Sequence, residues 1–467
     1  MMLRSIEAII QMLDADYIEY KDMSRKVSGV CIDSRKCTTG NLYIPIIGER
    51  FDGHDFAAQA IEQGAAAILW QKDHPNPPQN TAVILVDDTR EALSRLAAKY
   101  RESLDLVVIG ITGSNGKTST KDIMGSLLKR KYVTQKTYGN MNNEIGVPLT
   151  LLGLSDATQV AIIEMGMENL HEIDALSRMV QPDIAVITNV GEAHLENLGS
   201  IENIAKAKAE IVHGLKPRGV LLYYGEQAVL KKALWNEELP MGVCVKSFGH
   251  DERSDLFSYG KIVQDAKGIS FSSNLLREKA FMNVYGKHQV MNALPGIYVA
   301  RALGMSEEEI LEGLRDIEYT SMRNDLVSLR NGYLLDDSYK SNRQSVLAAL
   351  DTVSEFDLPR RVVVLADMLD MGDQAVKIHY ETGKAIGSYP VDRVCTYGEM
   401  ARFIAQGAIN AGIKEVTHYE SKEELQKDIE NEFDSPCIVL VKGSRGMKMD
   451  SIVSYLKEQE RGSVEHE

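Results

Sequence analysis

One short stretch of the chain combines the parts of a phosphate-binding loop. A β-branched run at residues 107–111 is followed by Gly113, Gly116, Lys117 and Thr118. Apolar residues then recur at the spacing of a helix. Because a strand, a glycine-rich turn and the start of a helix aim backbone N–H groups at phosphate, we expect a nucleotide-phosphate site here. Lys117 would reach the outer phosphates, and the Thr118 hydroxyl would bind Mg²⁺.

The loop is shorter than the usual phosphate-binding pattern. That pattern begins with a further glycine, and Ile111 occupies its position here. The alternative is a glycine turn with an exposed lysine, which the preceding strand and the following helix disfavour. The residues predicted to contact nucleotide phosphates are Gly113, Ser114, Asn115, Gly116, Lys117, Thr118 and Ser119.

Polar residues stand at the ends of two further strand-like runs. Glu164 ends the apolar run at 160–164, and His194 follows the run at 184–188. Ligands in open α/β sheets gather outside the carboxyl ends of the strands, so a carboxylate facing bound phosphates is well placed for Mg²⁺. The alternatives are a strand-end charge in water for Glu164 and a turn residue for His194. Lys208, on a downstream helix, is by itself interpreted as part of a solvated helix face.

Several domains must position these strands and loops. A length of 467 residues predicts about three domains. Residues 1–98 mix short strands and helices, whereas residues 99–313 and 314–467 each alternate apolar strands with helices. Such alternation is typical of an α/β fold with a largely parallel sheet. We therefore predict a small α/β N-terminal domain, a central parallel-sheet domain around the phosphate loop, and a doubly wound C-terminal domain.

The composition disfavours several classes of protein. A net charge of −15 argues against a general nucleic-acid binder. The five cysteines form no CxxC pair, so zinc is not expected, and their odd, scattered set suits a reducing cytosol. The N-terminus shows no signal-peptide pattern, and no apolar run approaches the roughly 18 residues of a membrane helix. We expect a cytoplasmic monomer with no membrane insertion and no nucleic-acid partner.

Taken in order, these residues resemble the Mur ligases, the ATP-dependent amide-forming enzymes of peptidoglycan precursor synthesis. The residues that carry the resemblance are Thr112 to Thr118, Glu164, Thr188, Asn189, His194, Lys208, Gly286 to Asn292, Arg323, Asp336 and Asp337. The shortened phosphate loop is also what the family shows. The resemblance implies a three-domain Mur ligase architecture. Residues 1–98 would bind a UDP-sugar, the central P-loop ATPase domain at 99–313 would bind ATP, and the Rossmann-like domain at 314–467 would bind the incoming amine.

The resemblance also implies catalytic and metal-binding roles. Lys117, His194 and Lys208 would be catalytic, and carbon dioxide would convert Lys208 to a carbamate. That reaction would turn a cation into an anion that orients the metal. Mg²⁺ would be held by Thr118, Glu164 and His194. ATP and Mg²⁺ are therefore the expected cofactors, with the γ-phosphoryl group passing to a carboxylate.

Further residues are expected to bind the nucleotide and the substrates. By resemblance, Asn292 would meet the adenine, while Arg323 and Asp337 would meet phosphate and ribose. Ser34 and Arg35 would hold the UDP portion of the acyl substrate. The residues assigned to the remaining substrate contacts are Asn142 and Asn143, on the muramoyl-peptide side, and Asn342.

Within the family, four stretches favour the member that joins D-alanyl-D-alanine to a UDP-N-acetylmuramoyl-tripeptide. They are residues 33–35, 51–56, 140–150 and 441–446. The Asp-Asn-Pro motif expected of the diamino-acid-adding relative is absent. The family's usual Asp-Asp-Ser-Tyr-Asn-Ala-Asn-Pro appears at residues 336–343 as Asp-Asp-Ser-Tyr-Lys-Ser-Asn-Arg. The alternatives are another ligase of the superfamily with a different amine, and a nucleotide-binding regulator without chemistry.

Overall fold

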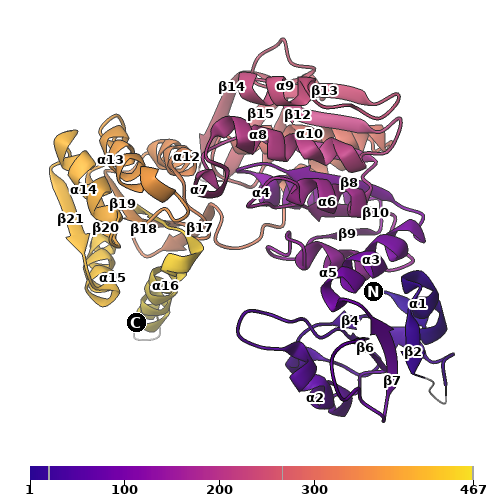
Figure 1. The fold of residues 1–467 in the computed structure, drawn as a ribbon. Helices are drawn as coiled ribbons and strands as arrows, with labels where there is room; N and C mark the ends of the chain where they lie inside the picture. The colour runs from indigo at the N-terminus through magenta and orange to yellow at the C-terminus, as the bar shows by residue number, and fades with distance from the viewer. Residues whose placement is uncertain (19–21, 266, 465–467) are drawn as a thin grey trace.

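The structure, a computed structural model, describes residues 1–18, 22–265 and 267–464. Its ribbon forms three lobes, with the N-terminal lobe in indigo and the C-terminal lobe in orange and yellow (Figure 1). The N-terminal lobe holds a five-stranded sheet in the order β2-β7-β6-β5-β4 and a two-stranded sheet of β1 and β3. Its elements are β1 Leu3–Ser5, α1 Ile6–Leu13, β2 Asp16–Ile18, β3 Lys26–Ser28, β4 Val30–Cys31, β5 Leu42–Tyr43, α2 Ala57–Glu62, β6 Ala67–Gln71, β7 Ala82–Val86 and α3 Thr89–Glu102.

The central lobe is built on a nine-stranded sheet in the order β16-β15-β14-β13-β12-β11-β8-β10-β9. All neighbouring strands from β14 to β9 are parallel, and β15 and β16 add an antiparallel edge. Its strands are β8 Val107–Thr112, β9 Thr134–Lys136, β10 Val160–Glu164, β11 Ile184–Ile187, β12 Val220–Tyr224, β13 Cys244–Gly249, β14 Leu256–Asp265, β15 Gly268–Ser273 and β16 Ala280–Met282. Its helices are α4 Lys117–Leu128, α5 Gly146–Leu152, α6 Glu172–Val180, α7 Leu195–Leu198, α8 Ile201–Ala209, α9 Ala228–Trp235, α10 Gln289–Ala302 and α11 Glu307–Arg315.

The C-terminal lobe holds a six-stranded sheet in the order β17-β18-β22-β19-β20-β21. The strands from β18 to β21 are parallel, and β17 is an antiparallel edge. Its elements are β17 Asp325–Leu329, β18 Gly332–Asp337, α12 Arg343–Ser354, β19 Arg360–Ala366, α13 Ala375–Ile386, β20 Arg393–Tyr397, α14 Ala401–Asn410, β21 Glu415–Tyr419, α15 Lys422–Glu430, β22 Cys437–Lys442 and α16 Asp450–Val464. The predicted α/β class with a three-domain architecture is confirmed.

The central strands are buried on both faces, as their sequences predict. β8, β10 and β11 are almost entirely apolar, and nearly all of their residues are buried. Alternate residues join different cores, with Val108 and Ile163 in one and Ile109 and Ile162 in the other. Continuous apolar runs of this kind are typical of parallel strands covered by helices. The carboxyl ends of these strands meet at one edge of the sheet, where Glu164 lies beside the phosphate loop.

The predicted domain boundaries fall inside helices. Helix α3 crosses the first of them, at 98/99, and helix α11 crosses the second, at 313/314. We therefore propose that the boundaries lie in the loops that follow, at residues 103–106 and 316–324.

In the described part of the chain, no helix is long and apolar enough to cross a membrane.

Candidate active site

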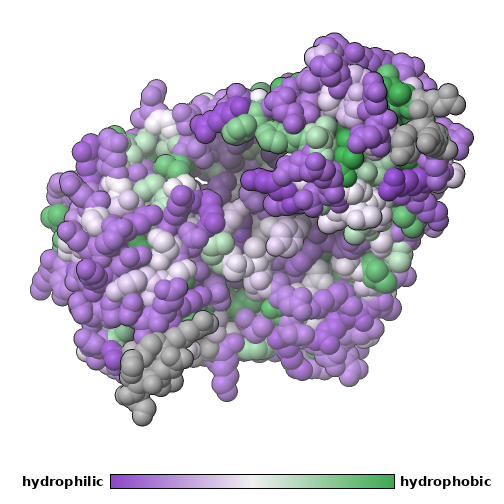
Figure 2. Space-filling view, turned by 90° about the horizontal axis from the view of Figure 1, so that it is seen from below, coloured by the Kyte–Doolittle hydropathy of each residue, from purple (hydrophilic) through white to green (hydrophobic). Residues whose placement is uncertain are grey.

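A large cavity opens between the three lobes. Its volume is about 1270 Å³. Helix α3 contributes Ser94, the central sheet contributes the phosphate loop with Glu164 and His194, and the C-terminal lobe contributes Asp337. Figure 2 shows a hollow between the C-terminal lobe, on the left, and the rest of the molecule. The cavity can therefore bring together ligands that are bound by different lobes.

Glycine is required at two positions of the phosphate loop. Gly113 has a φ of +149°, and a Cβ atom there would overlap Thr188 Oγ1. Gly116 has a φ of +80° at the N-terminus of α4, and a Cβ atom there would overlap Asn292 Oδ1. Thr188 Oγ1 also donates to the Asn115 carbonyl oxygen at 2.5 Å, which fastens the loop to the end of β11. The missing side chains let the loop lie tightly against its neighbours, with the start of α4 on the cavity.

Lys117 lies across the phosphate loop. Its Nζ donates to the Gly113 carbonyl oxygen at 2.6 Å. Burial is the main cause that lowers the pKa of Lys117, the charges of Lys340 and Arg323 also lower it, and Glu164 opposes them; together they give a pKa of about 7. A bound phosphate would place a negative charge beside Lys117. Its pKa would then rise, because an opposite charge favours the protonated form.

Glu164 joins the strand edge to the phosphate loop. Its Oε2 accepts a hydrogen bond from Thr118 Oγ1 at 2.9 Å, and its Oε1 accepts one from Asn142 Nδ2 at 2.8 Å. Lys121, which is buried one turn after Lys117 on α4, lies 3.4 Å from Oε2. Burial acts to raise the pKa of Glu164, but the charges of Lys121 and Lys117 outweigh it, so the pKa is lowered. The carboxylate is therefore held in its charged form.

The predicted metal ligands fit a small, hard cation. Thr118 and Glu164 place two side-chain oxygens side by side at the start of α4, and Mg²⁺ prefers such oxygens together with phosphate oxygens and water. His194 lines the same cavity from the loop after β11 and adopts a left-handed backbone with φ +66°. Burial and the charges of Lys340, Lys117 and Lys208 lower the pKa of His194 to about 3. Its imidazole is therefore neutral, which is the form that binds metals.

Lys208 does not belong to a solvated helix face. It is only 2% exposed on α8, whereas Lys206 on the same helix is exposed. Burial, together with the charges of Lys117 and Lys340, holds the pKa of Lys208 well below its ordinary value. The interpretation from charge pattern alone was therefore wrong for this residue. This lowered pKa favours the neutral amine, which is the form that can react with carbon dioxide.

The residues predicted for the adenine and ribose side also line the cavity. Asn292 Nδ2 donates to Gln289 Oε1 at 2.8 Å. The Arg323 guanidinium lies 4.1 Å from the centre of the Tyr339 ring, and its buried Nε has no hydrogen-bond partner. Asp337 is paired with the buried Lys442. The unpartnered Arg323 Nε fits a ligand that carries acceptor oxygens.

The C-terminal lobe is hydrogen-bonded directly to the phosphate loop. Asn342 Nδ2 donates to Asn115 Oδ1 at 2.8 Å, and Asn115 Nδ2 donates to Gln344 Oε1 at 3.0 Å. Asn342 also caps the N-terminus of α12. Asn342 was predicted to contact substrate, and here its side chain holds the loop on which the nucleotide phosphates are expected.

Sequence reasoning missed four residues of this cavity region: Lys121, Lys340, Gln344 and Lys442. Only Lys121 left a usable signal, because it lies four positions after Lys117 and so shares its helix face. Lys340 stood in the motif as a departure without an assigned role. Gln344 and Lys442 act through contacts with residues far away in the chain, which no local pattern records.

The two residues predicted to hold UDP lie elsewhere. Ser34 and Arg35 do not line the cavity described above. Ser34 Oγ donates to Gln59 Oε1 at 2.6 Å, and the Arg35 side chain pairs with Asp33 at 2.9 Å. By contrast, Asn142 and Asn143, predicted for the muramoyl-peptide side, both line the cavity. The residues predicted for the UDP-linked substrate therefore form two groups: Ser34, which is buried, and Arg35, which is exposed, lie in the N-terminal lobe, and Asn142 and Asn143 line the cavity.

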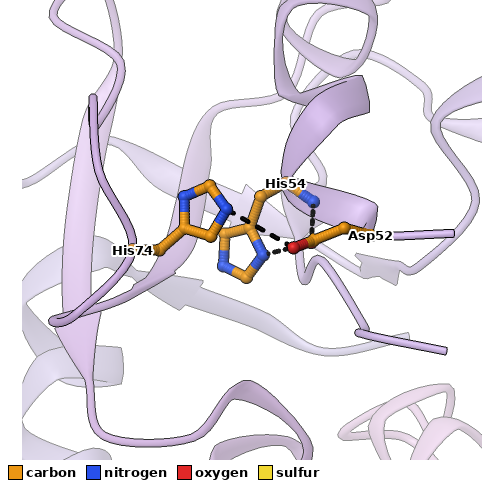
Figure 3. A group of neighbouring side chains, drawn as sticks. All are labelled: Asp52, His54 and His74. Carbon is orange, nitrogen blue, oxygen red and sulfur yellow. Dashed lines mark hydrogen bonds and ion pairs between the residues drawn. The ribbon is translucent and has the colours of Figure 1, made fainter.

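A second polar cluster lies in the N-terminal lobe and consists of Asp52, His54 and His74 (Figure 3). The Asp52 carboxylate lies 2.7 Å from His54 Nδ1 and 3.4 Å from His74 Nε2. The two imidazole rings are stacked with an angle of 10° between them, so their lone pairs cannot converge on one ion in this arrangement. The Gln71 N–H donates to His54 Nε2. Asp52 therefore fixes the tautomer of His54 and the turn around it, and we assign the cluster no metal.

Three family models cover most of the chain. The model of the "Mur ligase family, catalytic domain" matches residues 26–101, the "Mur ligase middle domain" matches residues 111–300, and the "Mur ligase, glutamate ligase domain" matches residues 322–445. The three lobes and the short phosphate loop agree with these matches. The chain belongs to the Mur ligase family.

Individual members of the family are similar to this chain over nearly its whole length. The UDP-N-acetylmuramoyl-tripeptide--D-alanyl-D-alanine ligase of Bacillus subtilis (strain 168) is 40% identical over 461 residues, which cover 98% of this chain and 99% of the relative. The ligase of the same name from Escherichia coli (strain K12) is 32% identical, over 92% of this chain and 94% of the relative. The crystal structure of MurF from Acinetobacter baumannii superposes with a TM-score of 0.88 at 29% identity, over 98% of this chain and 99% of that one.

Proposed function

We propose that this protein is the ATP-dependent ligase that joins D-alanyl-D-alanine to UDP-N-acetylmuramoyl-tripeptide in peptidoglycan synthesis. Relatives that carry this ligase's name align with nearly the whole chain, which supports the proposal. The MurF of Thermotoga maritima was solved in complex with ADP and has the same fold, with a TM-score of 0.81. In this chain, the observation that best supports it is the contact of Thr118 with Glu164 beside the phosphate loop, inside a cavity that all three lobes line.

The proposed reaction has two steps. A carboxylate oxygen of the tripeptide first attacks the γ-phosphorus of ATP, and the bond from that phosphorus to the β,γ-bridging oxygen breaks. This step gives an acyl phosphate and ADP. The amine nitrogen of D-alanyl-D-alanine then attacks the acyl carbon, the bond from that carbon to the bridging oxygen breaks, inorganic phosphate leaves, and the amine loses a proton. The carboxylate becomes a better acyl donor because phosphate is a better leaving group than oxide.

The side chains around the cavity fit the first of these steps. Phosphoryl transfer depends mainly on positioning and on neutralising the charge of the phosphoryl oxygens. We propose that Lys117 and the N-terminus of α4 bind the β- and γ-phosphates, and that Thr118, Glu164 and His194 hold Mg²⁺. Mg²⁺ would neutralise charge on the phosphate oxygens. A carbamate on Lys208 would add a negative group that orients the metal near His194.

The remaining predicted residues would bind the adenosine part of ATP and the UDP-linked substrate. We propose that Asn292, Arg323 and Asp337 bind the adenosine side of ATP, since all three line the cavity. Asn142 and Asn143 would meet the muramoyl peptide. The UDP portion would lie on the N-terminal lobe near Ser34 and Arg35, outside this cavity. Binding ligands on separate lobes and then closing them would exclude water from the acyl phosphate. Because the proposed substrates are ATP and a UDP-linked sugar, we propose that the protein acts in the cytoplasm. We also expect it to be a monomer.

An amine-specificity assay tests the proposal. The purified protein receives ATP, Mg²⁺ and a UDP-N-acetylmuramoyl-tripeptide, with D-alanyl-D-alanine or single D-amino acids as the amine, and phosphate release is measured. We expect release that depends on both the tripeptide and the dipeptide. Release with a different amine would support another ligase of the superfamily. Nucleotide binding without release for any amine would support a regulator instead.

A further inference from the structure

Lys340 comes from the C-terminal lobe but lies against the catalytic residues of the central lobe. It is in the loop after β18, and its Nζ is 3.4 Å from His194 Nε2. The loop is held in place because the buried Lys442 donates its Nζ to the Lys340 carbonyl oxygen at 2.8 Å. The ammonium group is therefore placed in the cavity by a fixed backbone.

The charges around Lys340 are unbalanced. Among the ion pairs of the described residues, neither Lys117 nor Lys340 has a carboxylate partner within 4.0 Å. Arg323 adds a third positive charge near both, and Glu164 is already paired with Lys121. Asp370, Glu164 and Glu168 are the carboxylates whose charges act on Lys340, and among the ion pairs of the described residues none of them pairs directly with it. Buried positive charges without a direct partner are costly unless a ligand supplies the negative charge. The cavity at this point is suited to a multiply charged anion.

Unpaired polar atoms lie beside the same group. Ser341, the next residue in the loop, is 3% exposed, and its Oγ has no hydrogen-bond partner. The buried Nε of Arg323 also lacks a partner. Buried polar groups are nearly always hydrogen-bonded in folded proteins. Arg323 and Ser341 line the same cavity as Lys340, so these two atoms indicate that an oxygen-rich ligand completes the site.

We propose that Lys340 binds the phosphoryl group during its transfer, facing Lys117 from the opposite lobe. The inference rests on the proposed function and deepens it: the C-terminal lobe supplies a cation for the first step, in addition to holding the amine. The transferred group spreads its negative charge over its outer oxygens, and two lysines from different lobes would neutralise it only when the lobes are closed. Phosphoryl transfer would thus depend on closure.

A carboxylate of the incoming dipeptide is the other anion that Lys340 could bind. The phosphoryl group is favoured because Lys340 contacts His194 and shares its surroundings with Lys117 and Glu164, at the nucleotide end of the cavity. A phosphoryl group also carries more charge than a carboxylate and so suits two lysines. The two anions enter at different steps, which makes them separable by experiment.

The test uses the full-length protein with Lys340→Met, which keeps the aliphatic stem and removes the charge, and with Lys340→Arg, which keeps the charge. Lys377→Met, at an exposed lysine on α13, is the matched control. The readout is the rate of ADP formation in a single turnover with ATP and UDP-N-acetylmuramoyl-tripeptide but no dipeptide. We expect a loss of about 10²-fold or more for Lys340→Met, partial recovery for Lys340→Arg, and no change for the control. The melting temperatures of all three should match the wild type.

Two results would overturn the inference while leaving the proposed function intact. One is wild-type ADP formation by Lys340→Met. The other is a raised KM for D-alanyl-D-alanine with an unchanged rate of ADP formation, which would assign Lys340 to the dipeptide carboxylate. If the wild-type protein itself formed no ADP from the tripeptide and ATP, and released no phosphate with the dipeptide, the proposed function and the inference would both fail.

Discussion

Thr118 Oγ1 donates a 2.9 Å hydrogen bond to Glu164 Oε2, which ties the first turn of α4 to the end of β10. This contact places a hydroxyl and a charged carboxylate beside the loop that is expected to carry the nucleotide phosphates. Hydroxyl and carboxylate oxygens bind hard cations such as Mg²⁺, so the contact is the geometric centre of the proposed chemistry. The contacts made by Asn342 and Lys340 then bring the C-terminal lobe to the same place.

Glu164→Gln tests the metal site. Glutamine can still accept from Thr118 but loses the charge, so we expect a folded protein whose activity at saturating ATP falls about 10²-fold or more. The Mg²⁺ concentration for half-maximal activity should rise as well. Glu168→Gln, at an exposed glutamate that also lines the cavity, is the control and should keep near-normal Mg²⁺ dependence. An unchanged Mg²⁺ titration for Glu164→Gln would remove Glu164 from the metal site.

Gly113→Ala tests the geometry of the phosphate loop. The new Cβ would meet Thr188 Oγ1 and force a backbone with positive φ, so the loop must shift. We expect loss of measurable ATP binding by calorimetry and a stability lower by about 2 kcal/mol or more. Gly48→Ala is the control, because a Cβ there makes only an ordinary contact of 3.6 Å. Normal ATP affinity in Gly113→Ala would contradict the proposed loop.

The phosphate loop and Glu164 were predictable because they follow local rules. The strand, the glycine turn and the helix follow one another directly in the sequence. Ligands gather at the carboxyl ends of the strands in a parallel sheet, and Glu164 ends a neighbouring strand. Lys208 was misjudged from its charge pattern, because the burial of a helix face depends on what packs against it. The position of Lys340 could not be predicted for a related reason: the residue it contacts, His194, is 146 positions away in the sequence. We propose domain boundaries a few residues later than the predicted ones because α3 and α11 continue past the predicted limits.

Lys117 predicts a pH dependence of ATP binding. Its pKa is about 7 in the protein alone, against an ordinary value of 10.5, and bound phosphates would raise it. Between pH 8 and 9 the free lysine is mostly neutral, so binding must take up about one proton, and the affinity should fall about tenfold per pH unit. Calorimetry in buffers of different ionisation enthalpy measures the uptake. Lys117→Met should abolish it, and equal uptake in both proteins would contradict the assignment.

Lys208 predicts a dependence on carbon dioxide. Burial lowers the pKa of its amine and so favours the neutral form that can become a carbamate, so removing carbon dioxide and bicarbonate should lower activity, and adding bicarbonate should restore it. Lys208→Ala should be inactive under both conditions. Lys206→Ala, at the exposed lysine on the same helix, should behave like the wild type. Full wild-type activity after thorough removal of carbon dioxide would rule out a required carbamate.

Isotope transfer tests the central claim most directly. The reacting carboxylate of UDP-N-acetylmuramoyl-tripeptide is labelled with oxygen-18, and the phosphate released during ligation to D-alanyl-D-alanine is analysed by mass spectrometry. An acyl phosphate keeps one carboxylate oxygen on phosphorus when the amine displaces phosphate, so we predict one labelled oxygen in each phosphate released. Ligation that releases unlabelled phosphate would show that the carboxylate is not phosphorylated.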